Sequence, residues 1–232
     1  MALLRSTIYA VVFYPATLLF VIACFIASKF GTDPMRAMVH RWTDFHHWFV
    51  RLLGTRIEVT GAIPSGAYLI AVKHQSMFET LEMMRIARTP IVVMKSELTT
   101  MPGFGWATRS YGVIGVDRNA GAKALRDMLT AGRQAAASGR PILIYPEGTR
   151  VRPGKMPPLQ AGFAGLYKAM NLPVVPVALD SGRLWGRDLP RSAGTIHIQI
   201  GDPIPAGLKR DEIEARVHSA INALELASKP GA

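Results

Sequence analysis

The 232-residue sequence has a single cysteine and few charged residues, and each shortage excludes a class of protein. One cysteine excludes a disulfide scaffold and any zinc site built from several cysteines. Charged side chains make up 19% of the chain and hydrophobic ones 49%, which excludes an intrinsically disordered protein. The sequence also lacks internal repeats and low-complexity tracts. Its length suits one domain of ordinary size, or a small domain with an appendage.

Acidic residues are scarce as well. The 16 Asp and Glu residues face 27 Lys and Arg residues, so the formal net charge is +11. The isoelectric point is near 10.2, and the mean hydropathy of +0.19 is high for a fully soluble protein. A chain that is both basic and apolar favours a membrane surface with anionic lipids as its partner over a nucleic acid.

An apolar segment near the N-terminus is long enough to cross a bilayer. Ile8–Ala27 is a run of 20 uncharged residues between Arg5 and Lys29, and a helix of that length reaches about 30 Å. Pro15 predicts a kink or a break, so a straight span and a bent, half-inserted segment both stay open. A cleaved signal peptide is a further alternative, because Val21–Cys24 resembles a lipoprotein cleavage box.

A second N-terminal segment has the pattern of an amphipathic helix. Asp33 is a good N-cap, and Pro34 suits the first helical position. Apolar residues then recur at steps of three and four, namely Met35, Met38, Trp42, Phe45, Phe49 and Leu52. This helix is expected at the membrane interface, although its apolar stripe would equally pack on the domain. His46 and His47 are adjacent, so they point in different directions and make a poor metal pair.

From Arg56 onward, short apolar runs alternate with longer helical stretches. Strands are expected at Arg56–Thr60, Tyr68–Val72, Ile91–Met94, Val113–Val116, Pro141–Tyr145, Val174–Ala178 and Thr195–Ile200. Helices are expected at Met77–Ile86, Gly121–Ser138, Gly162–Met170 and Asp211–Ala227. This alternation predicts an α/β fold with a mostly parallel sheet flanked by helices. We place that domain at residues 55–232, after membrane-associating helices in residues 1–54.

Ligands bind beyond the carboxyl ends of the strands in such sheets, which selects the loops Lys73–Ser76, Asp117–Gly121 and Pro146–Gly154. In the first loop, His74 follows a strand and Glu79 comes five residues later. If Glu79 lies in the first turn of a helix, its carboxylate can bind one imidazole nitrogen and leave the other as a base. The alternative is a capping box, with Ser76 as N-cap and Glu79 at the third helical position.

The other two loops carry weaker signals when each is taken alone. The segment Gly112–Arg118 is typical of an edge strand that ends in a solvated arginine. The segment Tyr145–Arg150 reads Tyr-Pro-Glu-Gly-Thr-Arg. It is either a glycine turn whose arginine suits bidentate phosphate binding or an ordinary turn with surface charges.

Taken together, these blocks resemble the glycerolipid acyltransferase family. The order is His-x4-carboxylate, Gly-x-Ile-x-x-x-Arg, Pro-Glu-Gly-Thr-Arg and finally Leu-Pro-Val-Val-Pro-Val at Leu172–Val177. The chain departs from the family in two places. Glu79 stands where Asp is usual, and Leu159–Gly162 stands where adjacent lysines are common.

The resemblance implies a role for each matching residue. It makes His74 the general base and Glu79 its carboxylate partner. The substrate-binding residues that it implies are Lys95, Arg118, Glu147, Gly148, Thr149 and Arg150. It implies no metal and no cofactor.

The resemblance also implies the reaction. A fatty acyl group would pass from acyl-CoA or acyl carrier protein to the free hydroxyl of a lysophospholipid, with 1-acylglycerol-3-phosphate and phosphatidic acid as the expected acceptor and product. The site would lie at the cytoplasmic face of the cell membrane. Two alternatives stay open: an acyltransferase for a lyso-aminolipid such as lyso-ornithine lipid, and a non-catalytic lipid-binding module. A serine hydrolase is disfavoured because the Gly-x-Ser-x-Gly elbow is missing.

Overall fold

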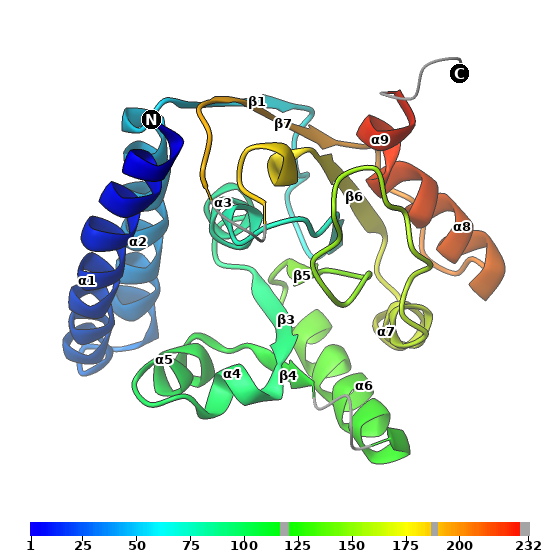
Figure 1. Ribbon diagram of the computed structural model, residues 1–232. Helices are drawn as coiled ribbons and strands as arrows, with labels where there is room; N and C mark the ends of the chain where they lie inside the picture. Colours follow the sequence, from blue (N-terminus) through cyan, green and yellow to red (C-terminus); the bar gives the residue numbers. More distant parts are fainter. Residues whose placement is uncertain (117–120, 187–189, 228–232) are drawn as a thin grey trace.

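The protein folds around a seven-stranded sheet with the strand order β1-β7-β6-β2-β5-β3-β4. The computed structural model describes residues 1–116, 121–186 and 190–227. The strands are β1 (Thr55–Thr60), β2 (Leu69–Val72), β3 (Ile91–Lys95), β4 (Ile114–Val116), β5 (Ile142–Ile144), β6 (Val174–Leu179) and β7 (Gly194–Ile200). β6 pairs with β7 in antiparallel fashion and the other pairs are parallel. The predicted mostly parallel sheet is therefore confirmed (Figure 1).

The helices of the main domain connect these strands. They are α3 (Phe78–Ile86), α4 (Ser96–Thr100), α5 (Phe104–Tyr111), α6 (Gly121–Ala137), α7 (Gly162–Met170), α8 (Arg210–Ile221) and α9 (Ala223–Ala227), with a 3-10 turn at Ser181–Arg183. The single helix predicted over Asp211–Ala227 is wrong, because α8 ends before Asn222, whose side chain binds outside the helix. The helices α4 and α5 were not predicted, since each is too short to show a clear apolar period.

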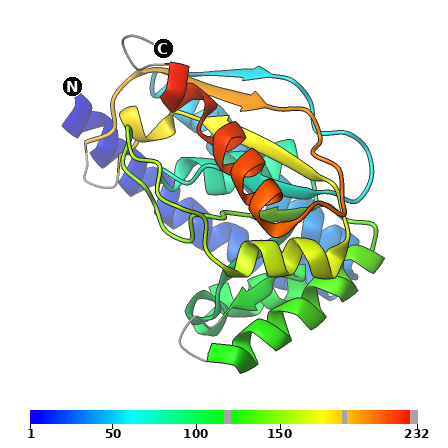
Figure 2. The ribbon, with the colours of Figure 1, turned by 90° about the vertical axis from the view of Figure 1, so that its right-hand side faces the viewer.

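Helices cover both faces of the sheet. Along β2, Ile70 and Val72 face a core shared with α1, α2 and α3. Leu69 and Ala71 face a second core built with α6, α7 and α8. In Figure 2, α7 and α8 lie in front of the strands and the N-terminal helices lie behind them. Burial on both faces explains why the central strands are apolar throughout instead of alternating.

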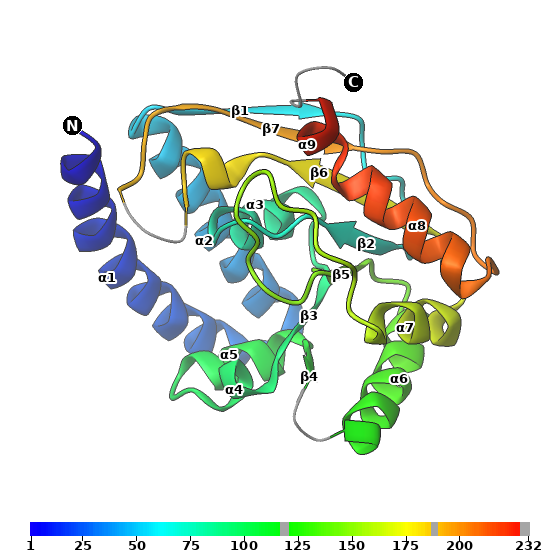
Figure 3. The same ribbon diagram turned by 45° about the vertical axis from the view of Figure 1, so that its right-hand side comes forward.

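The N-terminal helices α1 (Ala2–Ser28) and α2 (Thr32–Leu52) run side by side at one end of the molecule (Figures 1 and 3). α1 continues through Pro15, so the expected break is wrong. Tyr9 and Phe13 before the proline and Cys24 after it are buried, and this packing holds the helix on both sides. The predicted N-cap is also wrong, since α2 begins at Thr32 and Asp33 lies in its first turn.

One face of α1 is buried and the other is exposed. Tyr9 and Phe13 belong to the same core as the sheet residue Ile70. The exposed large apolar side chains of α1 are Leu3, Leu4, Ile8, Val11, Val12, Tyr14, Leu18, Leu19, Ile22, Phe25 and Ile26. Among the described residues, α1 is the helix long and apolar enough to cross a membrane. Exposed apolar side chains in this number are typical of a surface that contacts lipid or another protein. The independence of residues 1–54 as a unit stays a prediction.

The stripe of α2 is divided between core and surface. Met35 and Phe49 are buried, whereas Leu52 and the neighbouring Trp48 are exposed. Packing on the domain, one of the two expected roles, is therefore present. Placement of the exposed part at a membrane interface stays a prediction.

His46 on α2 is fully buried among aromatic rings of this core. Its ring lies 5.2 Å from Phe13 and 5.8 Å from Phe78, centroid to centroid. Neither ring nitrogen has a hydrogen-bond partner among the described residues. Burial lowers the pKa of His46 to about 3, although the nearby Glu82 opposes this shift. The folded protein therefore holds His46 as a neutral imidazole.

We expect His46→Phe to reduce the sensitivity of the fold to acid. In the unfolded chain a histidine takes up a proton near pH 6.5, whereas folded His46 stays neutral down to about pH 3. Between these values the unfolded state binds more protons, so stability falls with falling pH by up to ~1.4 kcal/mol per unit. Urea unfolding in detergent at pH 7 and pH 4.5 should show wild type losing about 2–3 kcal/mol more than the variant. If wild type and the variant lost the same stability between these two pH values, His46 would not be the buried neutral histidine inferred above.

Candidate active site

His74 and Glu79 meet where β2 passes into α3. β2 ends at Val72, and His74 lies in the short connection before the helix. Glu79 occupies the first turn of α3, which carries its carboxylate back over the connection. Glu79 Oε1 lies 2.9 Å from His74 Nδ1. The carboxylate is fully buried, while 15% of the His74 side chain is exposed.

Both oxygens of the Glu79 carboxylate accept several hydrogen bonds. Its Oε1 accepts the backbone N–H groups of Gln75 and Ser76, both at 2.6 Å. Its Oε2 accepts the hydroxyl groups of Ser76 and Ser181, both at 2.7 Å. The expected capping box is wrong in its register, because the N-cap of α3 is Met77 and Glu79 is the second helical residue instead of the third. Glu79 nevertheless accepts both the Ser76 N–H and the contact from the His74 ring. The two coexist, because one carboxylate has enough lone pairs for both.

These bonds keep Glu79 ionised. Burial alone would raise the pKa of Glu79, but the hydrogen bond and charge of His74, with the bonds from Ser76 and Ser181, lower it below its ordinary value. An ionised carboxylate on Nδ1 selects the imidazole tautomer that carries its proton there and leaves Nε2 as the basic nitrogen. No described residue forms a hydrogen bond with His74 Nε2.

Tyr145 packs against the imidazole ring. Its ring centroid lies 4.3 Å from that of His74, and its hydroxyl donates to the backbone carbonyl of Glu79 at 3.1 Å. Burial, and then the charge of Glu79, raise the pKa of Tyr145 well above its ordinary value. The phenol therefore stays neutral and restrains the imidazole without competing for its proton.

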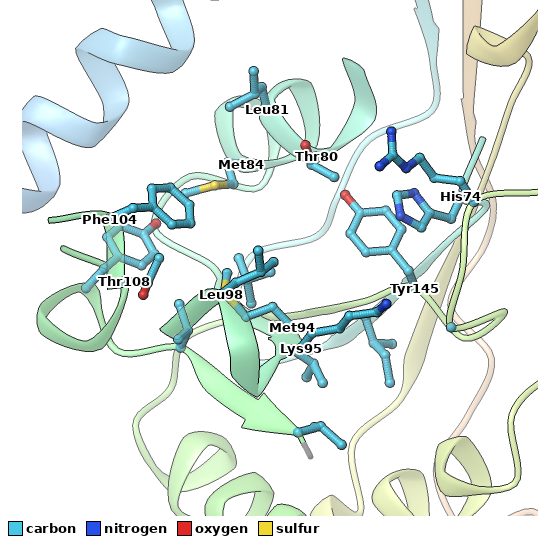
Figure 4. A pocket seen from close by; sticks show the side chains of 18 of the residues that line it. His74, Thr80, Leu81, Met84, Met94, Lys95, Leu98, Phe104, Thr108 and Tyr145 are labelled. Atoms are coloured by element: carbon cyan, nitrogen blue, oxygen red, sulfur yellow. The ribbon is translucent and has the colours of Figure 1, made fainter. Parts of the chain in front are cut away.

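His74 opens into a cavity of about 850 Å³. Figure 4 shows His74 and Tyr145 at one end of this cavity and Phe104 and Thr108 at the other. Most of the lining is apolar and comes from several helices, with Val21, Trp42, Leu81, Met84, Leu98, Phe104 and Ala107 among its members. The space thus joins a basic nitrogen to an apolar volume of the size of a lipid-like ligand.

Two cationic residues also line this cavity. Lys95 ends β3 and Arg150 follows β5, so both lie at the carboxyl edge of the parallel strands. In Figure 4 the Lys95 side chain points toward the His74 end. Within the described chain, neither cation forms an ion pair with a carboxylate. Their charge is therefore available to an anionic group of a ligand.

The remaining predicted binding residues are placed differently. Gly148 and Thr149 line the cavity, and Gly148 has a φ of +71°, a left-handed conformation that favours glycine. Glu147 is 2% exposed and points away from the lining. Arg118 lies outside the described residues.

Glu147 instead belongs to a buried network beneath the His74 connection. Its Oε1 accepts from Lys73 Nζ at 2.6 Å, and its Oε2 accepts from the His74 backbone N–H at 3.0 Å. Lys73 is itself fully buried. Its ammonium also donates to the Lys155 carbonyl at 2.8 Å and to Asn222 Oδ1 at 2.7 Å. All three protons of the ammonium therefore have acceptors.

Sequence reasoning missed three residues that complete the site: Lys73, Tyr145 and Ser181. Ser181 had a usable signal, because it follows β6 and β6 is parallel to β2. Its hydroxyl therefore emerges at the same edge as His74. Lys73 and Tyr145 adjoin the two motifs but show no pattern of their own.

Among the described residues, no three His, Cys, Asp or Glu side chains are arranged to hold a metal.

Known proteins resemble this chain in sequence. Residues 56–180 match the profile of the Acyltransferase family. A 1-acyl-sn-glycerol-3-phosphate acyltransferase of Pseudomonas aeruginosa is 34% identical over 175 residues, which cover 74% of this chain and 68% of that protein. The human 1-acyl-sn-glycerol-3-phosphate acyltransferase alpha is 30% identical over 171 residues, 71% of this chain and 60% of that protein. The chain thus spans less than two thirds of the human relative.

A solved structure resembles it in fold. The crystal structure of the 1-acyl-sn-glycerophosphate acyltransferase from Thermotoga maritima matches with a TM-score of 0.78 and covers all of both chains. The sequence identity is 18%, so this likeness shows the fold.

We expect Lys73→Met to destabilise the protein strongly. The change leaves the Glu147 carboxylate buried without its cation, and breaking a buried ion pair in this way costs about 3–5 kcal/mol. Arg216→Met is the matched control, because Arg216 pairs with Glu212 at 2.7 Å on an exposed helix face. It should cost less than about 1 kcal/mol. Urea unfolding would measure both, and equal costs would contradict the role of Lys73.

Proposed function

Because this chain belongs to the acyltransferase family, we propose that it transfers a fatty acyl group from an acyl thioester to the free hydroxyl of 1-acylglycerol-3-phosphate. The product would be phosphatidic acid, a precursor of phospholipids. The observation that carries the proposal is the His74 imidazole, which Glu79 binds at Nδ1 and which lines an apolar cavity.

Direct attack accounts for the chemistry with the residues present. His74 Nε2 removes the proton from the acceptor hydroxyl as that oxygen attacks the thioester carbonyl. The ionised Glu79 stabilises the imidazolium that forms. When the carbon–sulfur bond breaks, His74 returns the proton to the departing thiolate. The acyl group therefore moves from sulfur to oxygen without a covalent intermediate on the protein.

Lys95 and Arg150 are proposed to bind the phosphate of the acceptor. Both cations line the cavity into which His74 opens, so a phosphate held there would bring the hydroxyl of the same small molecule near the imidazole. Holding two reactants in this way lowers the barrier by proximity. Arg118, to which the family resemblance assigns the same substrate, is included in this proposal.

The apolar part of the cavity is proposed to hold a fatty chain. Burial there keeps the chain out of water, where each CH₂ costs about 0.8 kcal/mol. Acyl-CoA and acyl carrier protein both present the required thioester, so both are proposed donors. The reaction needs no cofactor.

The exposed face of α1 is proposed to lie in the cytoplasmic leaflet of the cell membrane. Tyr9 and Phe13 are buried in the core of the domain, which is incompatible with lipid on all sides of this helix. A helix immersed on one face, without crossing, fits this division. The enzyme could then take lysolipid from the bilayer without passing it through water.

A phosphate-free acceptor, such as lyso-ornithine lipid, is the second candidate. Gln160, Ala161 and Gly162 line the cavity where adjacent lysines are common in the resembling family. The cavity therefore has fewer cations than that family pattern leads one to expect. Parallel assays with phosphorylated and phosphate-free lysolipids would separate the two candidates.

We expect His74→Ala to lower kcat by about 10²–10⁴-fold, the usual contribution of a general base. The side chain is partly exposed and its removal creates no large cavity, so the variant should keep its thermal unfolding midpoint within a few degrees. Transfer of labelled acyl groups from acyl-CoA to 1-acylglycerol-3-phosphate measures the change. A folded variant with near wild-type kcat would remove His74 from the mechanism.

Arg150→Ala should act on binding instead. We expect the KM for 1-acylglycerol-3-phosphate to rise at least about tenfold, because a charge-assisted bond to phosphate is worth about 1.5–3 kcal/mol. Arg210→Ala, on an exposed helix, serves as the control. If the KM of Arg150→Ala matched that of the control, Arg150 would not bind the phosphate.

Polar substitutions on α1 test the membrane assignment. Leu18, Leu19 and Ile22 are 62%, 66% and 49% exposed, so serine at all three should leave the core intact. We expect co-sedimentation with anionic vesicles to fall at least about tenfold as apolar contact is lost. Serine at Val59 and Leu226, exposed residues outside α1, is the control. Unchanged binding of the triple variant would place the membrane contact elsewhere.

A further inference from the structure

The residues on either side of His74 are both tied to the C-terminal end of the chain. Lys73 donates to Asn222 Oδ1 at 2.7 Å, and Gln75 Nε2 donates to Glu225 Oε1 at 2.6 Å. Asn222 and Glu225, here called the C-terminal clamp, are 1% and 4% exposed. The clamp therefore reaches the His74 connection from about 150 residues away in the sequence.

Gln75 and Glu225 form the centre of a chain of three hydrogen bonds. The bond between their side chains is the middle one. At its two ends, Gln75 Oε1 accepts the Gly182 N–H at 2.9 Å, and Glu225 Oε2 accepts the Gly154 N–H at 2.7 Å. Gly182 follows β6 next to Ser181, and Gly154 belongs to the loop after β5. The chain thus joins three loops at the sheet edge to the C-terminal segment.

We propose that Asn222 and Glu225 are positioning residues for the reaction at His74. The inference rests on the proposed function, and it concerns residues beyond the 56–180 segment that matches the family profile. The clamp holds the side chains of Lys73 and Gln75, the residues before and after His74, while Glu79 holds the His74 ring. The direction of Nε2 then depends on both constraints.

The physical reason is that catalysis tolerates only small displacements of the reacting groups. A displacement of about 1 Å can cost as much as 100-fold in rate. The ring contact with Glu79 Oε1 fixes one point of the imidazole, but a moving backbone would rotate the ring about that point. Lys73 and Gln75 remove this freedom because their buried side chains each end on a satisfied partner.

An exchange of side chains tests the clamp. Glu225→Gln alone brings an amide NH₂ against either Gln75 Nε2 or the Gly154 N–H, so one buried donor loses its acceptor. Gln75→Glu alone sets two carboxylates face to face. The double variant Gln75→Glu/Glu225→Gln regenerates all three bonds. The carboxylate now at position 75 accepts from the Gly182 N–H and from the amide now at position 225, whose oxygen accepts from the Gly154 N–H.

The expected result is a loss of turnover that the exchange restores. We expect kcat of Glu225→Gln to fall at least about tenfold with the acceptor KM within about twofold. The double variant should recover most of the loss. Glu212→Gln makes the same chemical change at an exposed ion pair on α8 and should keep wild-type kcat. Assays run well below each unfolding midpoint separate turnover from unfolding.

Each outcome is decisive. Wild-type kcat in Glu225→Gln would overturn the proposal, as would a double variant that recovers its unfolding midpoint without recovering kcat. Failure of the proposed function looks different, because wild type itself would then transfer no acyl group. In that case hydrogen exchange of the His74 amide, faster in Glu225→Gln and restored in the double variant, still tests the clamp. Unchanged exchange would overturn it.

Discussion

The site depends on one buried carboxylate that stays charged. Glu79 is removed from water entirely, a change that costs several kcal/mol for an isolated ion. Two backbone amides, two hydroxyls and an imidazole offset that cost, and they come from the connections that follow β2 and β6. The charge exists only where these donors converge. The charge of Glu79 therefore depends on the assembly of this sheet edge, and so does the orientation of the His74 ring that it binds.

A second buried charge plays a supporting part beneath the first. Lys73 and Glu147 join the loops that follow β2 and β5, and Glu147 also holds the His74 backbone. The family resemblance assigns Glu147 to substrate binding. In this structure its carboxylate instead fixes the loops on either side of the site, through Lys73 and the His74 backbone. Its neighbours Gly148, Thr149 and Arg150 reach the cavity because Glu147 turns inward. Within this short motif, Glu147 fixes the loop, whereas the three residues that follow it face the cavity.

The sequence was sufficient for features that depend on local pattern. All seven strands match predicted apolar runs, and the meeting of His74 with Glu79 follows from a strand end and a helix start five residues apart. It was insufficient where partners are distant in the chain. Ser181, Asn222 and Glu225 become part of the site only through the sheet order. Asn222 also ends α8. The sequence did not reveal this end, because the amphipathic pattern continues past Asn222.

The helix α1 has an inner and an outer surface with different surroundings. Thr17, Phe20 and Cys24 line the cavity, while Leu18, Leu19 and Ile22 on the same turns are exposed. On this side of the cavity, one helix about 10 Å across therefore lies between the interior and the medium around the molecule. Any tilt or sliding of α1 along α2 changes the width of the space behind it. A displacement of α1 imposed from its exposed side would therefore change the room available to a chain bound in the cavity.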